Sequence, residues 1–221
     1  MSVKALVWVA LFFCVAEVLG LQSLKSEESS GSTEYYYRFD SPTFEMMRAE
    51  LRFDQAGRGQ FMFRRKADEE EIKLELHLLP TTLQRINTYL TEAQYLTSEE
   101  NYQGDRDMSH LGVMTFRFRQ GAHQRQVSFN YTRHPTMRLL AELLRHIVTQ
   151  ESRIFAIQLA RQYAPLDLDK QLATLQREVK NGWVAEPEKL LPLLEELQSD
   201  EGVLLIARRR AGDIVRLIKP R

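Results

Sequence analysis

The sequence is poor in cysteine: Cys14 is the only one in 221 residues. A single cysteine forms no internal disulfide and no cluster of thiolates, so the cysteine-based zinc sites are excluded. The chain also has no net charge, because 30 Lys and Arg stand against 30 Asp and Glu. It therefore has no overall field to attract nucleic acid or an anionic membrane, and a charge-driven partner requires a local patch.

The motifs of the common enzyme classes are missing as well. The sequence contains no Gly-x-Ser-x-Gly, no His-Glu-x-x-His and no phosphate-binding P-loop. Gly57-Arg58-Gly59 begins a dinucleotide-binding pattern, but Met62 stands where the third glycine belongs, and the segment joins two predicted strands instead of a strand and a helix. The sequence thus predicts a protein that is not an enzyme and has no cofactor.

A long apolar run occurs only at the amino terminus. Lys4 precedes apolar residues 5–16, and small residues follow at 18–20, an order typical of a secretion signal. The run is shorter than the ~20 residues of a membrane span, and Glu17 ends it; an uncleaved anchor is the alternative. We expect a signal peptide over residues 1–20 that is cleaved and takes Cys14 with it, an exported (periplasmic or secreted) mature chain, and no membrane span after cleavage.

The composition then divides the mature chain into three parts. Residues 21–34 are polar and rich in serine, which predicts a flexible linker. Residues 35–163 carry both strand and helix periodicities, and residues 164–221 carry only the helical one. We therefore expect a linker (21–34), an α+β domain (35–163) and a helical C-terminal extension (164–221).

Within the α+β domain, apolar residues that alternate with polar ones predict five strands. The predicted strands centre on residues 47–53, 61–63, 72–78, 114–118 and 127–131. Helices are expected to begin at Pro80 and Pro135, because proline suits the first turn of a helix. The resulting β-β-β-α-β-β-α order predicts a two-layer α+β fold, with an antiparallel five-stranded sheet covered by helices on one face and open to solvent on the other.

Beyond Pro165 the pattern predicts a cluster of short helices. The first ends at Asn181-Gly182, and two more are expected over residues 186–198 and 203–218. The last contains Arg208-Arg209-Arg210. We expect these arginines to be solvated or to pair with acidic residues near the end of the preceding helix, namely Glu195, Glu196, Asp200 and Glu201.

Three segments of the α+β domain carry a resemblance to known proteins. They are the glycine-containing turn 54–61, the segment Thr82-Leu-Gln-Arg-Ile86, and His110-Leu-Gly-Val-Met114 leading to Phe129-Asn-Tyr-Thr132. With them, residues 44–147 resemble small exported bacterial α+β domains of unassigned function. The resemblance implies a fold and export, and no catalytic site.

One polar loop could carry metal chemistry. Residues 97–110 contain Glu99, Glu100, Asp105, Asp107 and His110, whose oxygens and imidazole are ligands for divalent cations. Their spacing matches no calcium-binding loop. An exported hydrolase or metal-dependent enzyme that uses this loop is the alternative function.

The open sheet face offers the main candidate site. Strand alternation predicts that the face opposite the core carries many arginines, and arginine forms fork-like hydrogen bonds to carboxylate and phosphate. The structural interpretation is a solvated face with cross-strand ion pairs between arginine and Glu50 or Glu75. The functional interpretation is a surface that binds an acidic partner, with the partner-binding residues Arg48, Arg52, Arg64, His77, Arg117 and Arg119.

The preferred hypothesis is therefore an exported, non-catalytic module that binds a protein or envelope component through this face. One further motif concerns modification only. Asn130-Tyr131-Thr132 matches the N-glycosylation triplet, which matters in a eukaryotic source.

Overall fold

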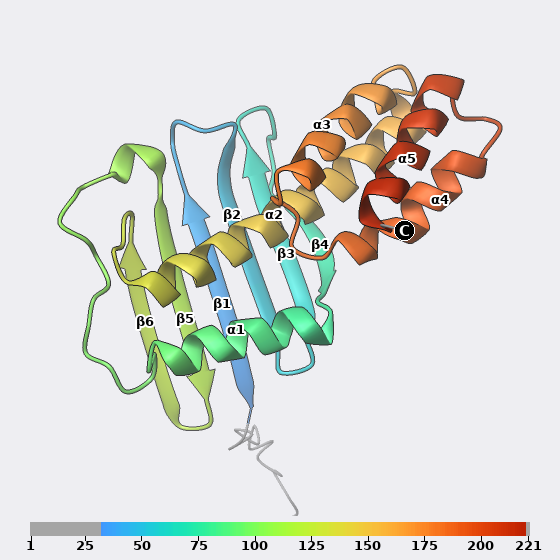
Figure 1. The fold of residues 1–221 in the computed structure, drawn as a ribbon. Helices are drawn as coiled ribbons and strands as arrows, with labels where there is room; N and C mark the ends of the chain where they lie inside the picture. Colours follow the sequence, from blue (N-terminus) through green and yellow to red (C-terminus); the bar gives the residue numbers. More distant parts are fainter. Residues whose placement is uncertain (1–31, 220–221) are drawn as a thin grey trace, which may run out of the picture. The chain divides into compact units, whose positions relative to one another are not determined.

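The structure is a computed structural model that describes residues 32–219. The predicted signal peptide and most of the predicted linker lie outside the described residues. The centre of the described part is an open antiparallel sheet of six strands in the order β4-β3-β2-β1-β5-β6 (Figure 1). The strands are β1 (Thr33–Asp40), β2 (Met46–Asp54), β3 (Arg58–Arg65), β4 (Ile72–His77), β5 (Val113–Gln120) and β6 (His123–Phe129).

The predicted count of five strands was wrong because β1 was missed. This strand pairs antiparallel with β2 on one side and with β5 on the other, so it joins the two groups of predicted strands. Its sequence hides the period of two, since Tyr35, Tyr36 and Tyr37 are identical residues on alternating faces: the first and third are buried and the second is half-buried. Thr33 and Glu34, placed in the linker by composition, are the first residues of β1.

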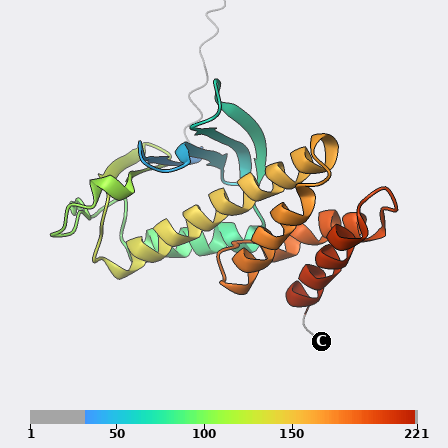
Figure 2. The ribbon, with the colours of Figure 1, turned by 90° about the horizontal axis from the view of Figure 1, so that it is seen from above.

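The predicted order of strands and helices is otherwise confirmed, and the helical elements of the described part follow that order. They are α1 (Pro80–Glu92), the short 3₁₀ helix η1 (Ser109–Leu111), α2 (Pro135–Tyr163), α3 (Leu168–Lys180), the 3₁₀ helix η2 (Pro187–Leu190), α4 (Leu191–Ser199) and α5 (Leu205–Ile218). Helices α1 and α2 both lie against one face of the sheet (Figure 2). No helix within residues 32–219 is long and apolar enough to cross a membrane.

Helix α2 is long enough to serve two apolar cores. Near its start, Leu140, Leu144 and Ile147 pack against the sheet together with α1. Near its end, Ile157 and Ala160 pack against α3, α4 and α5. We call the first assembly (β1–β6, α1 and the first half of α2) the sheet body and the second (the end of α2 with α3–α5) the helical cluster.

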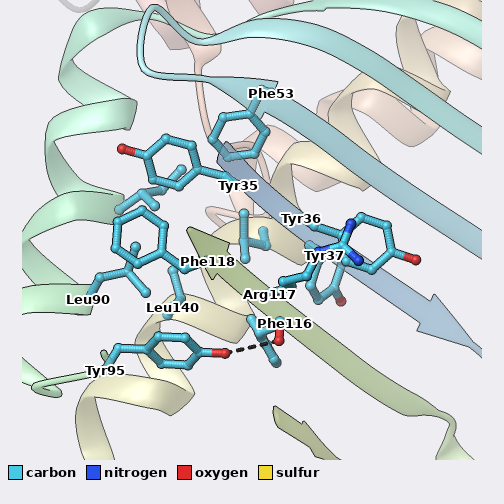
Figure 3. A pocket seen from close by; sticks show the side chains of 12 residues that line it. Tyr35, Tyr36, Tyr37, Phe53, Leu90, Tyr95, Phe116, Arg117, Phe118 and Leu140 are labelled. Atoms are coloured by element: carbon cyan, nitrogen blue, oxygen red, sulfur yellow. Dashed lines mark hydrogen bonds between the residues drawn. The ribbon is translucent and has the colours of Figure 1, made fainter. Parts of the chain in front are cut away.

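The sheet core is rich in aromatic rings, which come from the strand positions that face the helices. Phe61 and Phe63 lie on β3 and stack with ring centroids 5.0 Å apart, and Phe116 stacks on Phe129 across β5 and β6 at the same separation. Figure 3 shows the part of this core next to α1, where the Tyr95 hydroxyl donates to the backbone carbonyl of Phe116 at 2.9 Å. Alternation sends the remaining strand residues to the opposite side of the sheet.

Candidate binding surface on the open sheet face

All six residues predicted to bind a partner lie on one surface, the side of the sheet opposite α1 and α2. We call this surface the open face. The strand register arranges its side chains in rows that run across the sheet. One row contains Glu75, Gln60, Arg52, Tyr36, Arg117 and Gln126, in order from β4 to β6. This row brings together Arg52 and Arg117, which are 65 positions apart in the chain, with one residue between them.

That residue, Tyr36, is the centre of the open face. Its direct partners in the neighbouring strands are Arg52 on β2 and Arg117 on β5. Both guanidinium groups lie over its ring, with the Cζ of Arg117 4.6 Å and the Cζ of Arg52 5.3 Å from the ring centroid. Figure 3 shows Tyr36 and Arg117 next to each other, on the side of the strands away from the core rings. The tyrosine therefore holds two cations by its π-electrons.

The protonation states favour this arrangement. Partial burial is the main reason that the pKa of the Tyr36 hydroxyl is raised, and the carboxylate of Glu50 adds to the effect. A hydrogen bond to Glu50 is the main reason that the pKa of Arg52 is raised above its usual value. At neutral pH the Tyr36 ring is therefore uncharged and Arg52 is cationic, as a cation–π contact requires.

Arg52 is fixed a second time by a buried carboxylate. Glu50, two residues earlier on β2, accepts a hydrogen bond of 2.9 Å from Nη2 of Arg52. Its side chain is only 8% exposed although it faces the open side of the sheet. A buried carboxylate requires a counter-charge, so the role of Arg52 includes neutralising Glu50.

The other cations of the open face divide into paired and unpaired ones. Asp40 pairs with both Arg38 (2.6 Å) and Arg48 (2.8 Å), and Glu34 pairs with Arg119 across β1 and β5 (2.7 Å). These are the local ion pairs of a solvated face. Within residues 32–219, in contrast, no carboxylate lies within salt-bridge distance of Arg64, Lys73 or Arg117.

The remaining predicted residues lie away from the Tyr36 row. Arg64 is the direct partner of Arg48 on the neighbouring strand, so two like charges face each other there. His77 is exposed on the edge strand β4, with Arg58 as its partner. The structure thus brings only Arg52 and Arg117 around one group. The sequence analysis missed Tyr36, and the signal that could have found it is the aromatic run directly before Arg38.

The acidic loop 97–110 does not gather its carboxylates. Asp105 pairs with Arg133 at 2.7 Å, and Asp107 accepts hydrogen bonds from the backbone N–H of Ser109 and from the amide of Asn130. These bonds are the main cause of the lowered pKa of Asp107, with the Ser109 bonds first. Within the described part of the chain, no group of three His, Cys, Asp or Glu side chains is arranged to hold a metal ion.

This loop is instead held by hydrogen bonds to the sheet. Arg125 on β6 lies over the rings of Tyr95 and Tyr102, at 5.2 and 5.0 Å from their centroids, and donates to the backbone carbonyls of Tyr95 and Glu100. Asn130, directly after β6, uses its side chain to accept from the backbone N–H of Met108 and to donate to Asp107 of the loop. The amide of the predicted glycosylation triplet is therefore engaged within the protein.

The expected partners of the arginine triplet in α5 were wrong for one of its members. Arg210 forms a two-bond contact with Asp169 of α3, with Nε at 2.6 Å from Oδ1. The expected carboxylates of Glu196 and Asp200 pair with Arg161 of α2 instead, both at 2.7 Å. Proximity in the sequence suggested pairing with the preceding helix, α4. In the structure α5 also packs against α3, which brings Asp169 to Arg210.

Comparisons with known proteins give no family for this chain. No family model matches it, and no curated protein is significantly similar to it. The open face must therefore be interpreted from its own geometry.

Proposed function

We propose that the protein is an exported, non-catalytic module that binds an acidic protein or envelope component through its open face, with Arg117 and Tyr36 at the centre of contact. The observation that carries the proposal is the state of Arg117. It is a cation without a carboxylate partner in the described chain, and an aromatic ring fixes it in place.

Stacking prepares Arg117 to bind an anion. A guanidinium that lies over a ring keeps the N–H groups along its edges free, and these form paired hydrogen bonds with a carboxylate or phosphate. The stacked side chain has also lost rotamer freedom before binding, so less entropy is lost when the partner arrives. Arg64 and Lys73 extend the unpaired positive charge towards the β4 edge, which suits an elongated acidic segment more than a single small anion.

The strand interior makes this surface rigid. Arg52, Tyr36 and Arg117 lie on the neighbouring strands β2, β1 and β5, which are paired along their length, and the rings on the other side of these strands are buried. Rigid elements hold a binding constellation more precisely than loops do. The loop 97–110, the basis of the alternative enzymatic hypothesis, offers no comparable grouping of side chains.

Charge reversal at Arg117 tests the proposal. The matched control is Arg138→Glu, because Arg138 is an exposed arginine on α2, on the opposite layer, and its reversal changes the net charge equally. The probe is a fluorescein-labelled octaglutamate peptide, followed by fluorescence anisotropy at low and physiological salt. We expect Arg117→Glu to weaken binding about tenfold or more, and Arg138→Glu to leave it within about twofold, because charges outside the contact act only at long range.

Two results would contradict the proposal. One is equal binding by the wild type and by Arg117→Glu. The other is an equal loss in both variants, which would indicate an effect of net charge. Thermal unfolding of both variants serves as a check that each is folded at the temperature of the binding experiment, because Arg117 is half-buried whereas Arg138 is exposed.

A further inference from the structure

A second surface feature lies on the helix side of the sheet, away from the open face. It is a cleft of about 470 Å³, within the size range of small-molecule sites. It opens between the start of β1, the turn from β2 to β3, the second half of α1 and the segment after α1. The cleft is lined by Thr33, Tyr35, Gln55, Asn87, Leu90, Thr91, Gln94, Tyr95, Leu96, Thr97, Phe118 and Gln120. Figure 3 shows four of its apolar residues, Tyr35, Leu90, Tyr95 and Phe118, between the sheet and α1.

Of residues 32–219, those that line this cleft are all uncharged, in a protein of which 27% of residues are charged. An ionic ligand would lose hydration on entering and would find no counter-charge. The cleft therefore suits an uncharged ligand. This distinguishes it from the open face, where cations dominate.

Its polar groups are amides and hydroxyls that both donate and accept hydrogen bonds. Gln55, Gln94 and Gln120 are exposed at its rim and approach from three different segments. On α1, Asn87 accepts a hydrogen bond of 2.6 Å from the Tyr35 hydroxyl through Oδ1, which leaves its NH₂ group as a donor to the cleft. Such groups match the hydroxyls of a sugar, which also donate and accept, while the aromatic and leucine side chains offer an apolar floor for its C–H faces.

Gln94 reaches the cleft from the turn that ends α1. This residue follows the end of α1 with a φ of +46°, a left-handed conformation that favours glycine. The turn there is closed by backbone bonds alone, from Gln94 N–H to Thr91 and from Tyr95 N–H to Leu90. Glycine would satisfy this turn with less strain. A glutamine at this position puts its amide on the wall of the cleft.

We propose that this cleft binds a neutral saccharide, held by the amides of Gln94, Gln120, Gln55 and Asn87. The site is separate from the open face, so the two proposals stand independently. A saccharide site on one layer and an anion-binding surface on the other would let the module hold two components at once.

The experiment uses the protein from residue 21 onward and follows its backbone amide chemical shifts by NMR. Chitotetraose, cellotetraose and maltotetraose are added in turn at millimolar concentration, and tetragalacturonate serves as the charged control. We expect at least one neutral tetrasaccharide to shift resonances of the cleft residues, and tetragalacturonate not to. Gln94→Gly should weaken that binding about tenfold, because an amide hydrogen-bond pair is lost, while its Tm stays equal or rises because the strain is relieved.

A second cleft variant and a control variant complete the test. Gln120→Ala should weaken the same binding, whereas Gln126→Ala, which removes an exposed amide from the open face, should not. The proposal is overturned if none of the three neutral tetrasaccharides binds, if tetragalacturonate binds equally well, or if Gln94→Gly and Gln120→Ala both bind like the wild type. Arg117→Glu should leave saccharide binding unchanged, so a failure of the proposed function and a failure of this inference are distinguishable.

Discussion

The sheet body and the helical cluster are stabilised by different side chains. The core of the body contains stacked rings, such as Tyr35 on Phe53 with centroids 4.8 Å apart. The buried core of the cluster contains only Leu, Ile and Ala. The cluster instead has ion pairs between its helices: the two oxygens of Glu178 on α3 accept from Arg153 on α2 at 2.8 and 3.0 Å, and Arg210 on α5 binds Asp169 on α3.

This difference indicates which interactions determine the relative positions of strands and helices in each part. Large rings bury much area per residue and pack in few orientations, so ring packing positions most of the core of the body. Aliphatic side chains such as those of this core pack in more than one arrangement at similar energy, so they define the rotation of one helix against the next less strictly. The fork of an arginine specifies which face of one helix meets the next, and Arg153, Arg161 and Arg210 connect α2 to α3, α2 to α4 and α5 to α3.

The two parts meet at a buried polar joint. Glu186, between α3 and η2, is 1% exposed and accepts a hydrogen bond of 2.7 Å from the backbone N–H of Leu79 at the start of α1. Lys189 of η2 donates to Glu151 of α2 at 2.6 Å and to the backbone carbonyl of His77 at 2.8 Å. Since the amide of Gln150 also accepts from the N–H of Glu186, the joint ties η2 to both α1 and α2.

The largest effect is expected in the aromatic core. Phe61 on β3 has no exposed surface, so Phe61→Ala should lower the free energy of unfolding by about 3–5 kcal/mol. The counterpart in the cluster is Leu194→Ala, also fully buried, for which about 2–4 kcal/mol is expected. Urea unfolding followed by far-UV circular dichroism gives both values.

The same pair of variants tests whether the sheet body and the helical cluster unfold together as one unit or separately as two. Trp183 lies between α3 and η2, and it is the only tryptophan after residue 8. If the joint couples the parts, its fluorescence and the circular dichroism should change at the same urea concentration in both variants. Separate midpoints in Phe61→Ala would mean that the helical cluster stays folded without the body.

The next largest effect is expected at the joint. Lys189→Met removes the cation beside two buried carboxylates, those of Glu151 and Glu186. Breaking a buried pair in this way is strongly destabilising. The Lys189 side chain is 23% exposed, so water relieves part of the cost, and we expect a loss of about 2–3 kcal/mol. Glu188→Ala, an exposed neighbour in the same short helix, is the control and should change the stability by less than about 0.5 kcal/mol.

Regular patterning explains how much of the body could be predicted from the sequence. Ile72, Leu74 and Leu76 alternate with charged residues, and the helices at Pro80 and Pro135 begin with a proline, so local rules identify them. The strand β1 escaped these rules because its inward and outward residues are both tyrosines. The aromatic run before Arg38 is a local signal for this strand, but it does not show which of its rings packs in the core and which holds two arginines.

The candidate surface could be predicted only in outline. Alternation placed Arg52 and Arg117 on the open face, but their common neighbour Tyr36 depends on a strand pairing between distant segments. The ion pairs between helices also could not be predicted from the sequence. Arg210 binds Asp169, which is 41 positions away, and such contacts follow from helix packing and not from sequence spacing.

The pH dependence should have opposite signs in the two regions. Burial raises the pKa of Glu151 at the joint, with Lys189 opposing it. The folded state therefore binds more protons than the unfolded state above the ordinary value of 4.5, and this contribution to stability is lost as the pH rises through the folded pKa. In the body, hydrogen bonds from Arg65 lower the pKa of Asp68 below 3.8. Its contribution is present above that value and is lost as the pH falls.

Thermal unfolding of two variants across pH 3–7 checks these signs. Relative to the wild type, Glu151→Gln should remove a decline in stability above about pH 4.5, with a slope of at most about 1.4 kcal/mol per pH unit. Asp68→Asn should remove a rise in stability on the acidic side instead. For each variant, the slope of stability against pH is compared with that of the wild type. If the two slopes change in the same direction, the contrast between the joint and the body is contradicted.

The smallest effect is expected for the exposed pairs of the open face. Arg119 and Glu34 are 38% and 54% exposed, so water and salt screen their attraction, and Arg119→Ala should cost about 0.2–1 kcal/mol. Arg52→Ala on the same face should cost more, about 1–3 kcal/mol, because it leaves the buried carboxylate of Glu50 without its hydrogen-bond donor. Chemical denaturation with urea at low and high salt separates the two, since salt should reduce the effect of Arg119→Ala and leave most of the effect of Arg52→Ala. Equal losses would mean that the open face is solvated uniformly and that Glu50 does not anchor the Tyr36 row.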